Sequence, residues 1–375
     1  MSADKVVAIW RSGLIRGSET FIRSQGDALT DWRPVYLGAV KIESPLARDT
    51  DVIAFPDARG GGLGFLLLRL TGGSSRLTAM LRKFRPAVVH AHFGGDGWLI
   101  SRSAARTRVP LVITLHGLDA TSMPNAPGLR GIRYRRNLRQ AFDRAALIIA
   151  VSSFIRDKAI SLGADPRKVR VHHTGVPIPA TVPALTKKWD AIFVGRFVEK
   201  KGIDDLIEAV GMLAELRPRV LFIGDGPLEA GMRERATQLG VDAPFLGAQE
   251  PRVVSRCMAE SKVFVLPSKT ASDGNSEGLP TTILEAASLG IPTVSTYHSG
   301  IPEAVVHGET GLLGNERDRV ALARHLRRLL TDDALRTRMG QQARRHVEAN
   351  FDLRKQTRHL EELYDSVAVR DRTSA

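Results

Sequence analysis

The chain has 375 residues, of which 43% are hydrophobic and 25% charged, as is usual for a soluble globular protein. Its one cysteine, Cys257, excludes an internal disulfide and fits a reducing compartment. The net charge of +14 lies entirely in the first half, because residues 1–178 hold 27 Lys and Arg against 13 Asp and Glu, whereas residues 179–375 hold 27 of each kind.

Two features of the chain argue against a membrane-spanning protein. The longest apolar runs, residues 63–70 and 145–151, are too short to cross a bilayer. The N-terminus MSADKVVAIW has no long apolar segment, so we expect no signal peptide. The length favours two domains, each large enough for its own core. We therefore expect a cytoplasmic protein that is soluble or peripheral on the inner face of the cell membrane.

The first predicted element is a strand at residues 6–10, followed by a loop that contains Gly13 and Gly17. Ser18 is the expected N-cap of the next helix, whose apolar positions include Phe21 and Ile22. A strand, a glycine turn and a helix begin many nucleotide-binding folds. However, RSGLIRG is not the dinucleotide-binding fingerprint, so this segment alone identifies no ligand.

Two further buried-type strands each end in a histidine and a glycine. They occupy residues 86–94 and 111–119, and they carry His92 and His116. Ligands of parallel α/β sheets bind at the carboxyl ends of the strands, so both histidines are candidates to line a cleft. A hydrogen-bonded structural role is the alternative for each of them. Asp119 is placed to orient His116 or to contact a substrate.

A basic amphipathic stretch, GLRGIRYRRNLR, follows at residues 128–139. Its five arginines alternate with apolar side chains, which suits a membrane surface or an anionic acceptor as well as a solvated helix face. Tyr134 is the one aromatic residue in the stretch, whereas nucleic-acid grooves need several for stacking. We therefore do not expect a nucleic-acid partner.

The best linker in the chain contains three prolines, Pro177, Pro179 and Pro183, and predicts a domain boundary after residue 178. The second domain opens with a strand at residues 191–194, a turn that carries Arg196 and Lys201, and a helix at residues 203–216. Fixed cations beside the first amides of a helix predict a phosphate site. Surface charges on a loop are the alternative.

After a strand at residues 220–223, the tight turn GDGP contains Gly226. A loop and a helix then occupy residues 268–290, SKTASDGNSEGLPTTILEAASLG. Glu277 stands just before the helix, and Glu285, eight residues later, lies one turn inside it. The backbone N–H groups of Gly278, Leu279, Thr281 and Thr282 are expected to be unpaired at this helix start. Such donors are a suitable site for a phosphate.

A phosphate site flanked by two carboxylates suits a ligand with phosphate and hydroxyl groups, such as a nucleotide sugar. The alternative is that Glu277 is an ordinary N-terminal helix charge and Glu285 a surface residue. No DxD motif beside a strand indicates a metal, and two fixed cations can neutralise a diphosphate instead.

Taken together, these motifs resemble the retaining glycosyltransferases of family 4. The matches run in order over roughly residues 6–365: SETFI, HAHFG, HGxD, VSSFI with HHTGV, GR-x4-KG, GDGP and E-x7-E. SETFI and DGNSEGLP are similar to the subgroup that builds bacterial exopolysaccharides such as colanic acid and amylovoran. The resemblance implies the α/β fold named GT-B, in which two Rossmann-like domains face each other across a cleft. It also implies an acceptor domain at residues 1–178, a donor domain at 179–350, and a final helix at 351–375 that returns to the first domain.

The resemblance also assigns roles to residues of this sequence. It implies catalytic roles for Arg196, Lys201 and Glu277, with His116 near the transferred sugar, and acceptor contacts for His92, His116 and Asp119. It implies donor binding by Gly13, Gly17, Arg196, Lys201, Gly226, Glu277, Gly278, Leu279, Pro280, Thr281 and Glu285. The expected reaction moves a hexose from a UDP- or GDP-linked donor to a saccharide or a lipid-linked saccharide. No metal and no other cofactor are expected.

Other functions fit the same motifs. A nucleotide-sugar epimerase or a phosphorylase uses this fold, and an epimerase acts on the donor without an acceptor. The acceptor can also be a secondary metabolite. A non-catalytic membrane-binding protein would exploit the basic first half and would be indifferent to Glu277→Ala. The sequence fixes neither the sugar, the nucleotide, the acceptor, the linkage nor the oligomeric state.

Overall fold

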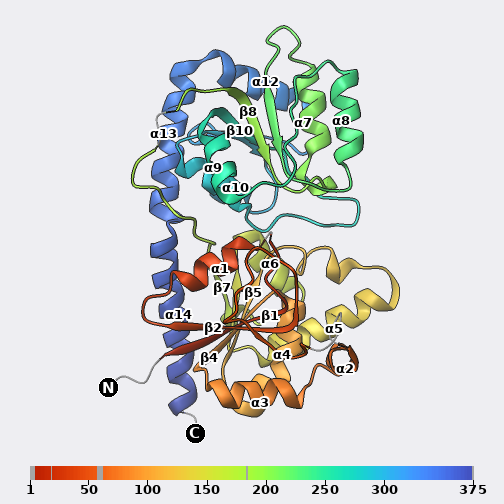
Figure 1. Cartoon of the computed structure of the whole chain (residues 1–375), viewed down its shortest axis with the longest axis vertical. Helices are drawn as coiled ribbons and strands as arrows, with labels where there is room; N and C mark the ends of the chain where they lie inside the picture. Colours follow the sequence, from red (N-terminus) through yellow and green to blue (C-terminus); the bar gives the residue numbers. More distant parts are fainter. Residues whose placement is uncertain (1–4, 18, 57–61, 183–184, 374–375) are drawn as a thin grey trace. The chain divides into compact units, whose positions relative to one another are not determined.

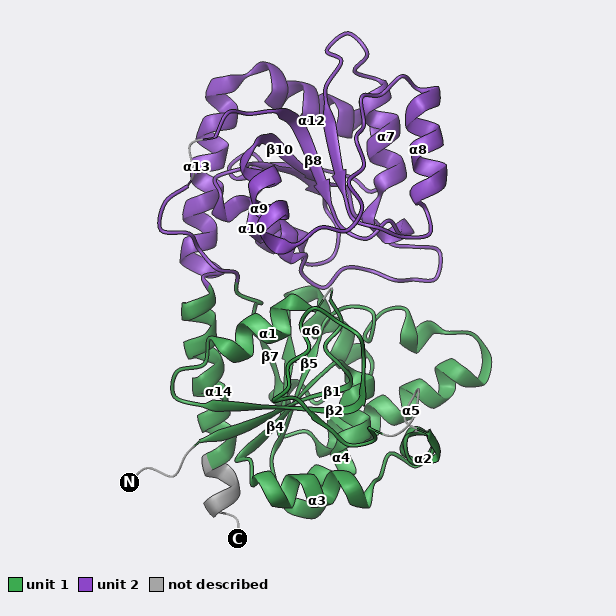
Figure 2. Cartoon of the chain, in the orientation of Figure 1, with its two compact units in different colours: residues 1–175, 353–375 green, residues 176–352 purple. Residues whose placement is uncertain are grey.

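The computed structural model describes residues 5–17, 19–56, 62–182 and 185–373 (Figure 1). The chain divides into two compact units. Unit 1 contains Met1–Gly175 and Leu353–Ala375, and unit 2 contains Val176–Asp352 (Figure 2). The expected boundary after residue 178 therefore falls three residues beyond the division seen in the structure. The expected N-cap Ser18 lies outside the described residues.

Unit 1 is built on a parallel sheet with the strand order β3-β2-β1-β4-β5-β6-β7. Its strands are β1 Val6–Leu14, β2 Arg33–Lys41, β3 Val52–Ile53, β4 Val88–His92, β5 Leu111–Leu115, β6 Leu147–Ala150 and β7 Val169–Val171. Its α-helices are α1 Thr20–Asp27, α2 Gly62–Thr71, α3 Ser75–Phe84, α4 Gly94–Thr107, α5 Gly128–Arg144, α6 Ser153–Ser161 and α14 Leu353–Thr373.

Helices cover both faces of this sheet because its strands alternate their side chains between the faces. Val7 and Ile9 of β1 share a core cluster with Leu360 and Tyr364 of α14. On the opposite face, Trp10 donates a hydrogen bond from Nε1 to the backbone oxygen of Asp96 in α4, at 2.9 Å.

Helix α14 is tied to unit 1 by buried polar contacts as well as by apolar packing. The carboxylate of Glu361 accepts hydrogen bonds from the backbone N–H groups of Thr30, Asp31 and Trp32, at 2.7, 2.7 and 3.2 Å. The hydroxyl of Tyr364 lies 2.6 Å from Nδ1 of His90 in β4. The last helix of the chain therefore completes the unit that the first strand begins.

Unit 2 is built on a second parallel sheet with the order β12-β11-β10-β8-β9. Its strands are β8 Trp189–Val194, β9 Val220–Ile223, β10 Ser261–Leu266, β11 Thr293–Thr296 and β12 Gly311–Gly314. Its α-helices are α7 Ile203–Gly211, α8 Glu229–Gln238, α9 Pro251–Ala259, α10 Thr281–Ser288, α11 Ile301–Ala304, α12 Arg319–Thr331 and α13 Asp333–Asn350.

Two expected boundaries differ from the structure. Strand β1 continues to Leu14, and Gly13 pairs with Val40 of β2, so Gly13 lies inside a strand and not in the predicted loop. Helix α7 ends at Gly211 instead of residue 216. No helix of the described residues is long and apolar enough to cross a membrane.

Candidate functional site

The strand order of unit 2 reverses direction at one particular pair of strands, β8 and β10. From β8 the chain continues to β9 on one side, and from β10 it continues to β11 and β12 on the other. The loops that leave the carboxyl ends of β8 and β10 therefore diverge, and ligands of open α/β sheets bind at such a switch point. Arg196 and Lys201 follow β8, and Glu277 follows β10.

The structure brings Lys201 and Glu277 together at this point. The Nζ atom of Lys201 lies 2.9 Å from Oε1 of Glu277, and Nζ of Lys200 lies 3.4 Å from Oε2. Glu277 is 5% exposed. The sequence predicted both residues for the donor site, but it did not predict that they form an ion pair.

The ion pair fixes the charge of the carboxylate. Burial raises the pKa of Glu277, but the charges of Lys200 and Lys201 outweigh it and lower the pKa to about 2. Glu277 is therefore ionised at neutral pH and accepts hydrogen bonds without donating them. Burial also lowers the pKa of Lys201, an effect that Glu277 opposes.

His298, at the end of β11, holds the backbone of Glu277. Its Nε2 accepts a hydrogen bond from the backbone N–H of Glu277 at 3.1 Å, while its Nδ1 lies 2.7 Å from Oε1 of Glu316. Because Nε2 accepts, the proton of the neutral ring resides on Nδ1 and is donated to the carboxylate. His298 and Glu316 therefore position Glu277, and no motif in the sequence indicated this.

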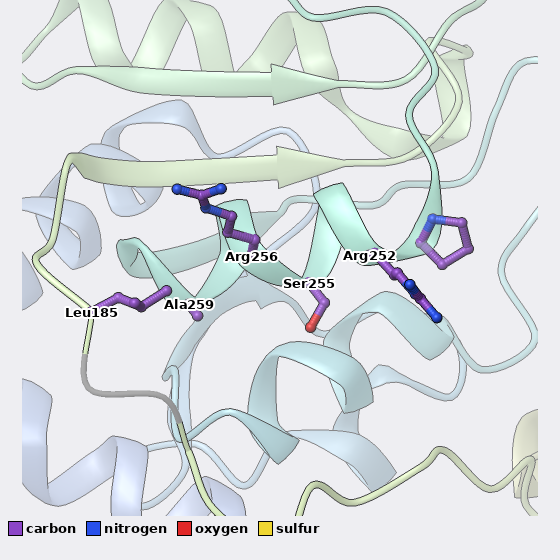
Figure 3. A pocket seen from close by; sticks show the side chains of 6 residues that line it. Leu185, Arg252, Ser255, Arg256 and Ala259 are labelled. Atoms are coloured by element: carbon purple, nitrogen blue, oxygen red, sulfur yellow. The ribbon is translucent and has the colours of Figure 1, made fainter.

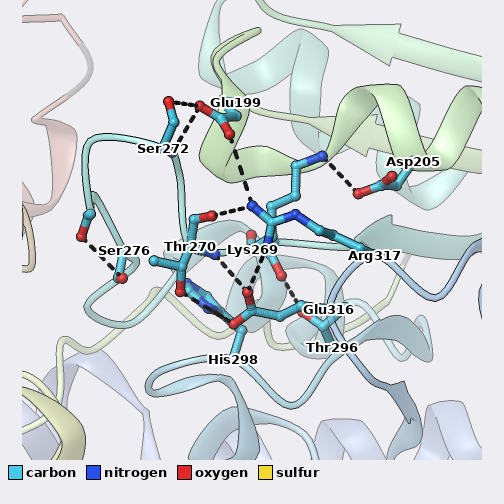
Figure 4. Close-up of polar contacts among 12 residues, drawn as sticks. Glu199, Asp205, Lys269, Thr270, Ser272, Ser276, Thr296, His298, Glu316 and Arg317 are labelled. Carbon is cyan, nitrogen blue, oxygen red and sulfur yellow. Dashed lines mark hydrogen bonds and ion pairs between the residues drawn. The ribbon is translucent and has the colours of Figure 1, made fainter.

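A network of polar contacts holds the loop between β10 and α10 (Figure 4). Glu316 accepts from the backbone N–H of Thr270 at 2.8 Å, and Glu199 accepts from the backbone N–H and the hydroxyl of Ser272 at 3.0 and 2.7 Å. The side chain of Arg317 donates to the backbone oxygen of Thr270 at 2.7 Å. The loop that carries Glu277 is thus fixed at its polar first half.

Lys269 joins the start of this loop to helix α7. It is 4% exposed, and its Nζ lies 2.6 Å from Oδ2 of Asp204 and 2.7 Å from Oδ2 of Asp205. Asp205 also pairs with Arg319 at 2.8 Å. Because Lys269 is fully engaged by two carboxylates, its role is to hold the loop against α7, and its charge is neutralised.

Helix α10 begins directly after the loop, with Pro280 at its N-cap position and no side-chain cap. Among the described residues, no acceptor contacts the backbone N–H groups of Gly278, Leu279, Thr281 and Thr282. The buried Oγ1 of Thr282 also has no hydrogen-bond partner there. The structure therefore has the unpaired donors that the sequence predicted at this helix start, and their binding of an anion stays a prediction.

Glu285 is the fifth residue of α10, one turn after its start, and is half-buried. Burial raises its pKa, and a hydrogen bond with the side chain of Thr281 opposes this shift. Its carboxylate is thus directed along the helix toward the N-terminus, where the unpaired donors lie.

The other predicted donor residues of unit 2 differ in their surroundings. Arg196 is exposed and makes no ion pair with any residue that the structure describes, so its charge is available to a ligand. Gly226 has φ 151°, and a Cβ at this position would lie 2.5 Å from the backbone oxygen of Phe197. The close approach of two backbones therefore explains Gly226 without a ligand.

Gly202 has a similar structural cause. It joins the lysine-bearing turn to α7 at φ 65°, and a Cβ would lie 1.9 Å from the backbone oxygen of Pro267. A glycine here lets the turn after β8 lie directly against the end of β10. This contact brings the lysines close to the loop that carries Glu277.

In unit 1 the structure separates the two candidate histidines by burial. His92 is 1% exposed and its Nδ1 lies 3.0 Å from Nε2 of His116, which is half-buried. His92 therefore supports His116, and the acceptor contact expected for His92 is not supported. Nδ1 of His116 has no hydrogen-bond partner within the described ranges.

The rings of Phe21 and Phe93 lie 4.8 and 4.6 Å from the ring of His116. Burial, followed by the charge of Arg11, lowers the pKa of His116 well below its ordinary value. The imidazole is therefore neutral at physiological pH and can exchange a hydrogen bond with a hydroxyl.

Asp119 does not orient the imidazole, contrary to expectation. Its Oδ1 accepts from the backbone N–H groups of His116 and Gly117, both at 3.0 Å, and its Oδ2 accepts from that of Gly94 at 2.9 Å. Asp119 is 3% exposed and both of its oxygens are engaged. It fixes the backbone of the histidine loop, so an acceptor contact is not supported.

The loop between β1 and α1 is fixed by a buried charge cluster that sequence reasoning missed. Arg11 pairs with Glu19 and with Asp96. Glu19 also accepts from the backbone N–H of Arg16 at 3.3 Å. Gly17 is exposed in this loop, which leaves it accessible to a ligand, whereas Gly13 lies within β1 and is half-buried.

A separate shallow pocket of about 450 Å³ lies on α9 of unit 2 (Figure 3). It is lined by Leu185, Pro251, Arg252, Ser255, Arg256 and Ala259. None of the predicted site residues lines it, so it is distinct from the switch point where Lys201 and Glu277 lie.

Comparison with known proteins identifies the family. The model for Glycosyltransferase Family 4 matches residues 15–178, and the model for Glycosyl transferases group 1 matches residues 178–346. WcaL of Escherichia coli, assigned to colanic acid biosynthesis as a glycosyltransferase, is 32% identical over 297 residues, which cover 76% of this chain and 71% of WcaL. The chain belongs to the family 4 (group 1) glycosyltransferases. The family resemblance predicted from the motifs is confirmed.

A further relative and two solved structures are also similar to this glycosyltransferase. AmsK of Erwinia amylovora, an amylovoran biosynthesis glycosyltransferase, is 29% identical over 302 residues, or 78% of this chain and 73% of AmsK. The solved structure of HepE from Anabaena in complex with UDP has a TM-score of 0.76 at 19% identity and covers 96% of this chain and 100% of HepE. Sucrose-phosphate synthase from Thermosynechococcus elongatus has the same TM-score and identity, with 97% and 99% covered. The predicted GT-B fold class is confirmed.

Proposed function

We propose that this glycosyltransferase moves a hexose from a nucleoside diphosphate sugar to a hydroxyl of a saccharide or lipid-linked saccharide, with retention of the anomeric configuration. The observation that carries the proposal is the meeting of Lys201, Glu277 and the uncapped start of α10 at the switch point of one sheet. Cations, unpaired amides and a carboxylate at one place match the diphosphate and hydroxyl groups of such a donor.

In the proposed reaction the bond between the anomeric carbon and the diphosphate oxygen breaks. The acceptor oxygen bonds to the same carbon on the same face, and its proton passes to the departing phosphate oxygen. Arg196, Lys201 and the amides of Gly278 to Thr282 would neutralise the charge that grows on the diphosphate. These fixed charges would do so without a metal ion.

Glu277 would accept hydrogen bonds from sugar hydroxyls, and Glu285 from the ribose. A carboxylate whose pKa is about 2 is a weak base and a weak nucleophile, which favours same-face transfer over a covalent intermediate on Glu277. In unit 1, the unpartnered Nδ1 of His116 is the best-placed group for contact with a hydroxyl. We assign His116 to the acceptor or the transferred sugar.

The similarity to WcaL and AmsK supports a role in exopolysaccharide or cell-surface glycan synthesis. The UDP bound by HepE supports a UDP-linked donor, with a GDP-linked donor as the other option to test. We further propose that the enzyme acts in the cytoplasm, at the inner face of the membrane where lipid-linked saccharides are extended.

The test uses transfer of the sugar to water, which needs no acceptor. The protein is incubated with UDP-, GDP-, ADP- and dTDP-hexoses, release of the nucleoside diphosphate is measured, and proton NMR follows the first hexose released. We expect one nucleotide to be preferred, with the donor's own anomer appearing first. Arg196→Gln should slow release roughly 100-fold, whereas Arg324→Gln, on the exposed side of α12, should not.

Release of the opposite anomer would overturn retention. Equal rates for wild type and Arg196→Gln would overturn the donor site. Conversion of the donor into another nucleotide sugar, without transfer, would indicate an epimerase instead.

A further inference from the structure

Helix α2 exposes an apolar face that no part of the described chain covers. Its leucines follow the helical spacing i, i+3, i+4, i+7, which places them on one side of the helix. Leu68, on the opposite side, is fully buried in unit 1. Helix α2 therefore has apolar side chains on both its inner and its outer side, although the described residues cover only the inner side. The outer side contains Leu63, Leu66, Leu67 and Leu70, which are 71%, 51%, 49% and 53% exposed.

Helix α5 continues this surface with the same helical spacing. Arg133 of α5 donates a hydrogen bond to the backbone oxygen of Arg69 in α2, so the two helices are neighbours (Figure 1). On the exposed side of α5, Leu129 and Ile132 are 83% and 56% exposed and stand beside Arg133 and Arg136.

The charge around these apolar side chains is one-sided. Helix α2 contains no acidic residue, and α5 contains Asp143 as its one acidic residue against six arginines. The arginines of α5 are Arg130, Arg133, Arg135, Arg136, Arg139 and Arg144. Exposing several leucines to water is unfavourable in free energy unless a partner covers them.

We propose that the exposed sides of α2 and α5 form a docking surface for an anionic phospholipid bilayer. The leucines of α2, with Leu129 and Ile132, would enter the boundary between headgroups and acyl chains, while the arginines would contact lipid phosphates. An apolar helix side bordered by arginines is the pattern of helices that lie in the membrane interface. A second copy of this chain is the less suitable occupant, because it would bring two arginine-rich surfaces together.

The inference goes beyond the proposed reaction, since α2 and α5 contain none of the residues assigned to the donor. It gives the basic stretch at residues 128–139 a definite partner and adds the exposed leucines of α2, which the sequence did not assign to this surface. It also places the surface in unit 1, whose excess of positive charge would attract anionic lipids over a distance of about 8 to 10 Å at moderate salt.

The test measures co-flotation of the full chain with vesicles of phosphatidylcholine and phosphatidylglycerol, and with vesicles of phosphatidylcholine alone. The apolar variant is Leu66→Gln with Leu67→Gln, matched by Val320→Gln on the exposed side of α12 in unit 2. The charge variant is Arg130→Gln with Arg136→Gln, matched by Arg324→Gln with Arg328→Gln.

We expect binding to the anionic vesicles, at least tenfold weaker binding for the leucine variant, and roughly fivefold weaker binding for each arginine removed. The unit 2 variants should bind as wild type does. Added salt should weaken binding of wild type more than that of the arginine variant.

Three outcomes would overturn the proposal. The first is that wild type does not float with anionic vesicles, and the second is that the leucine variant binds as well as wild type. The third is a concentration-dependent dimer, seen by sedimentation, that the leucine variant abolishes, because this would make a second copy the occupant. Donor binding measured on each variant shows whether that variant is folded. If wild type itself does not bind a donor, this result counts against the proposed reaction and not against the docking surface.

Discussion

Replacing Glu277 with glutamine should destabilise the protein by an amount that depends on pH. The buried carboxylate has a pKa of about 2 instead of 4.5, because it lies beside Lys200 and Lys201. This difference corresponds to about 3 kcal/mol of stability at neutral pH. Since the folded pKa is the lower one, the stabilisation is fully present above about pH 5 and is lost as the pH falls toward 2.

The assay is urea-induced unfolding of wild type and Glu277→Gln, followed by circular dichroism at several pH values. We expect the variant to lose about 3 kcal/mol at pH 7 and only about half of that at pH 3, because by then the carboxyl of the unfolded chain, which has the higher pKa, is already protonated. Glu309→Gln, at an exposed glutamate of unit 2, is the matched control and should match wild type throughout.

A double variant separates the ion pair from other effects of Glu277. Lys201→Met alone leaves the buried carboxylate with less compensation, and Glu277→Gln alone leaves the buried ammonium unpaired. The combined variant should therefore cost less than the sum of the two single variants. Additive losses, or a loss for Glu277→Gln that does not change between pH 7 and pH 3, would refute the reasoning.

Two further predictions concern the groups that support the two units. His298→Leu removes the acceptor for the buried N–H of Glu277, so we expect the rate of donor hydrolysis to fall roughly tenfold or more. His298→Gln can still accept and donate hydrogen bonds and should retain most of the rate. Equal rates for both variants would contradict the positioning role of His298. Glu361→Gln removes the charge that accepts three backbone N–H groups of unit 1, so the urea midpoint should drop by the equivalent of about 2–3 kcal/mol, with donor affinity unchanged in calorimetry.

The sequence was sufficient for the fold class and for most residues at the switch point of unit 2. Buried-type apolar runs predicted the parallel strands, and the spacing of Glu277 and Glu285 placed them before and inside one helix, as α10 shows. These predictions could be made from local sequence patterns, because the ends of strands and the starts of helices determine which backbone donors are unpaired.

Contacts between distant segments could not be predicted in the same way. The pairing of His298 with Glu277 and Glu316 depends on the adjacency of β10 and β11, and nothing in the local sequence of His298 encodes it. The burial of His92 likewise depends on neighbours from other strands, so its position after a strand suggested exposure at a cleft. Asp119 was expected to orient His116 or to contact a substrate, whereas its carboxylate accepts hydrogen bonds from backbone N–H groups.

The exposed apolar side of helix α2 also could not be predicted from the sequence. From the sequence, its run of leucines indicated only an apolar segment too short to span a membrane. The leucine spacing alone does not say which side of the helix faces the core. The structure shows that Leu68 is buried and that the other leucines of α2 are exposed.

The central claim is that unit 2 binds a nucleotide sugar at the start of α10, and calorimetric titration tests it most directly. UDP- and GDP-hexoses would be titrated into wild type, Glu285→Ala and the exposed-site control Glu309→Ala. The account predicts that one nucleotide binds, that Glu285→Ala weakens it roughly 10- to 150-fold, and that Glu309→Ala leaves it unchanged. If no nucleotide sugar binds, or if Glu285→Ala binds as tightly as wild type, the donor site does not lie at α10.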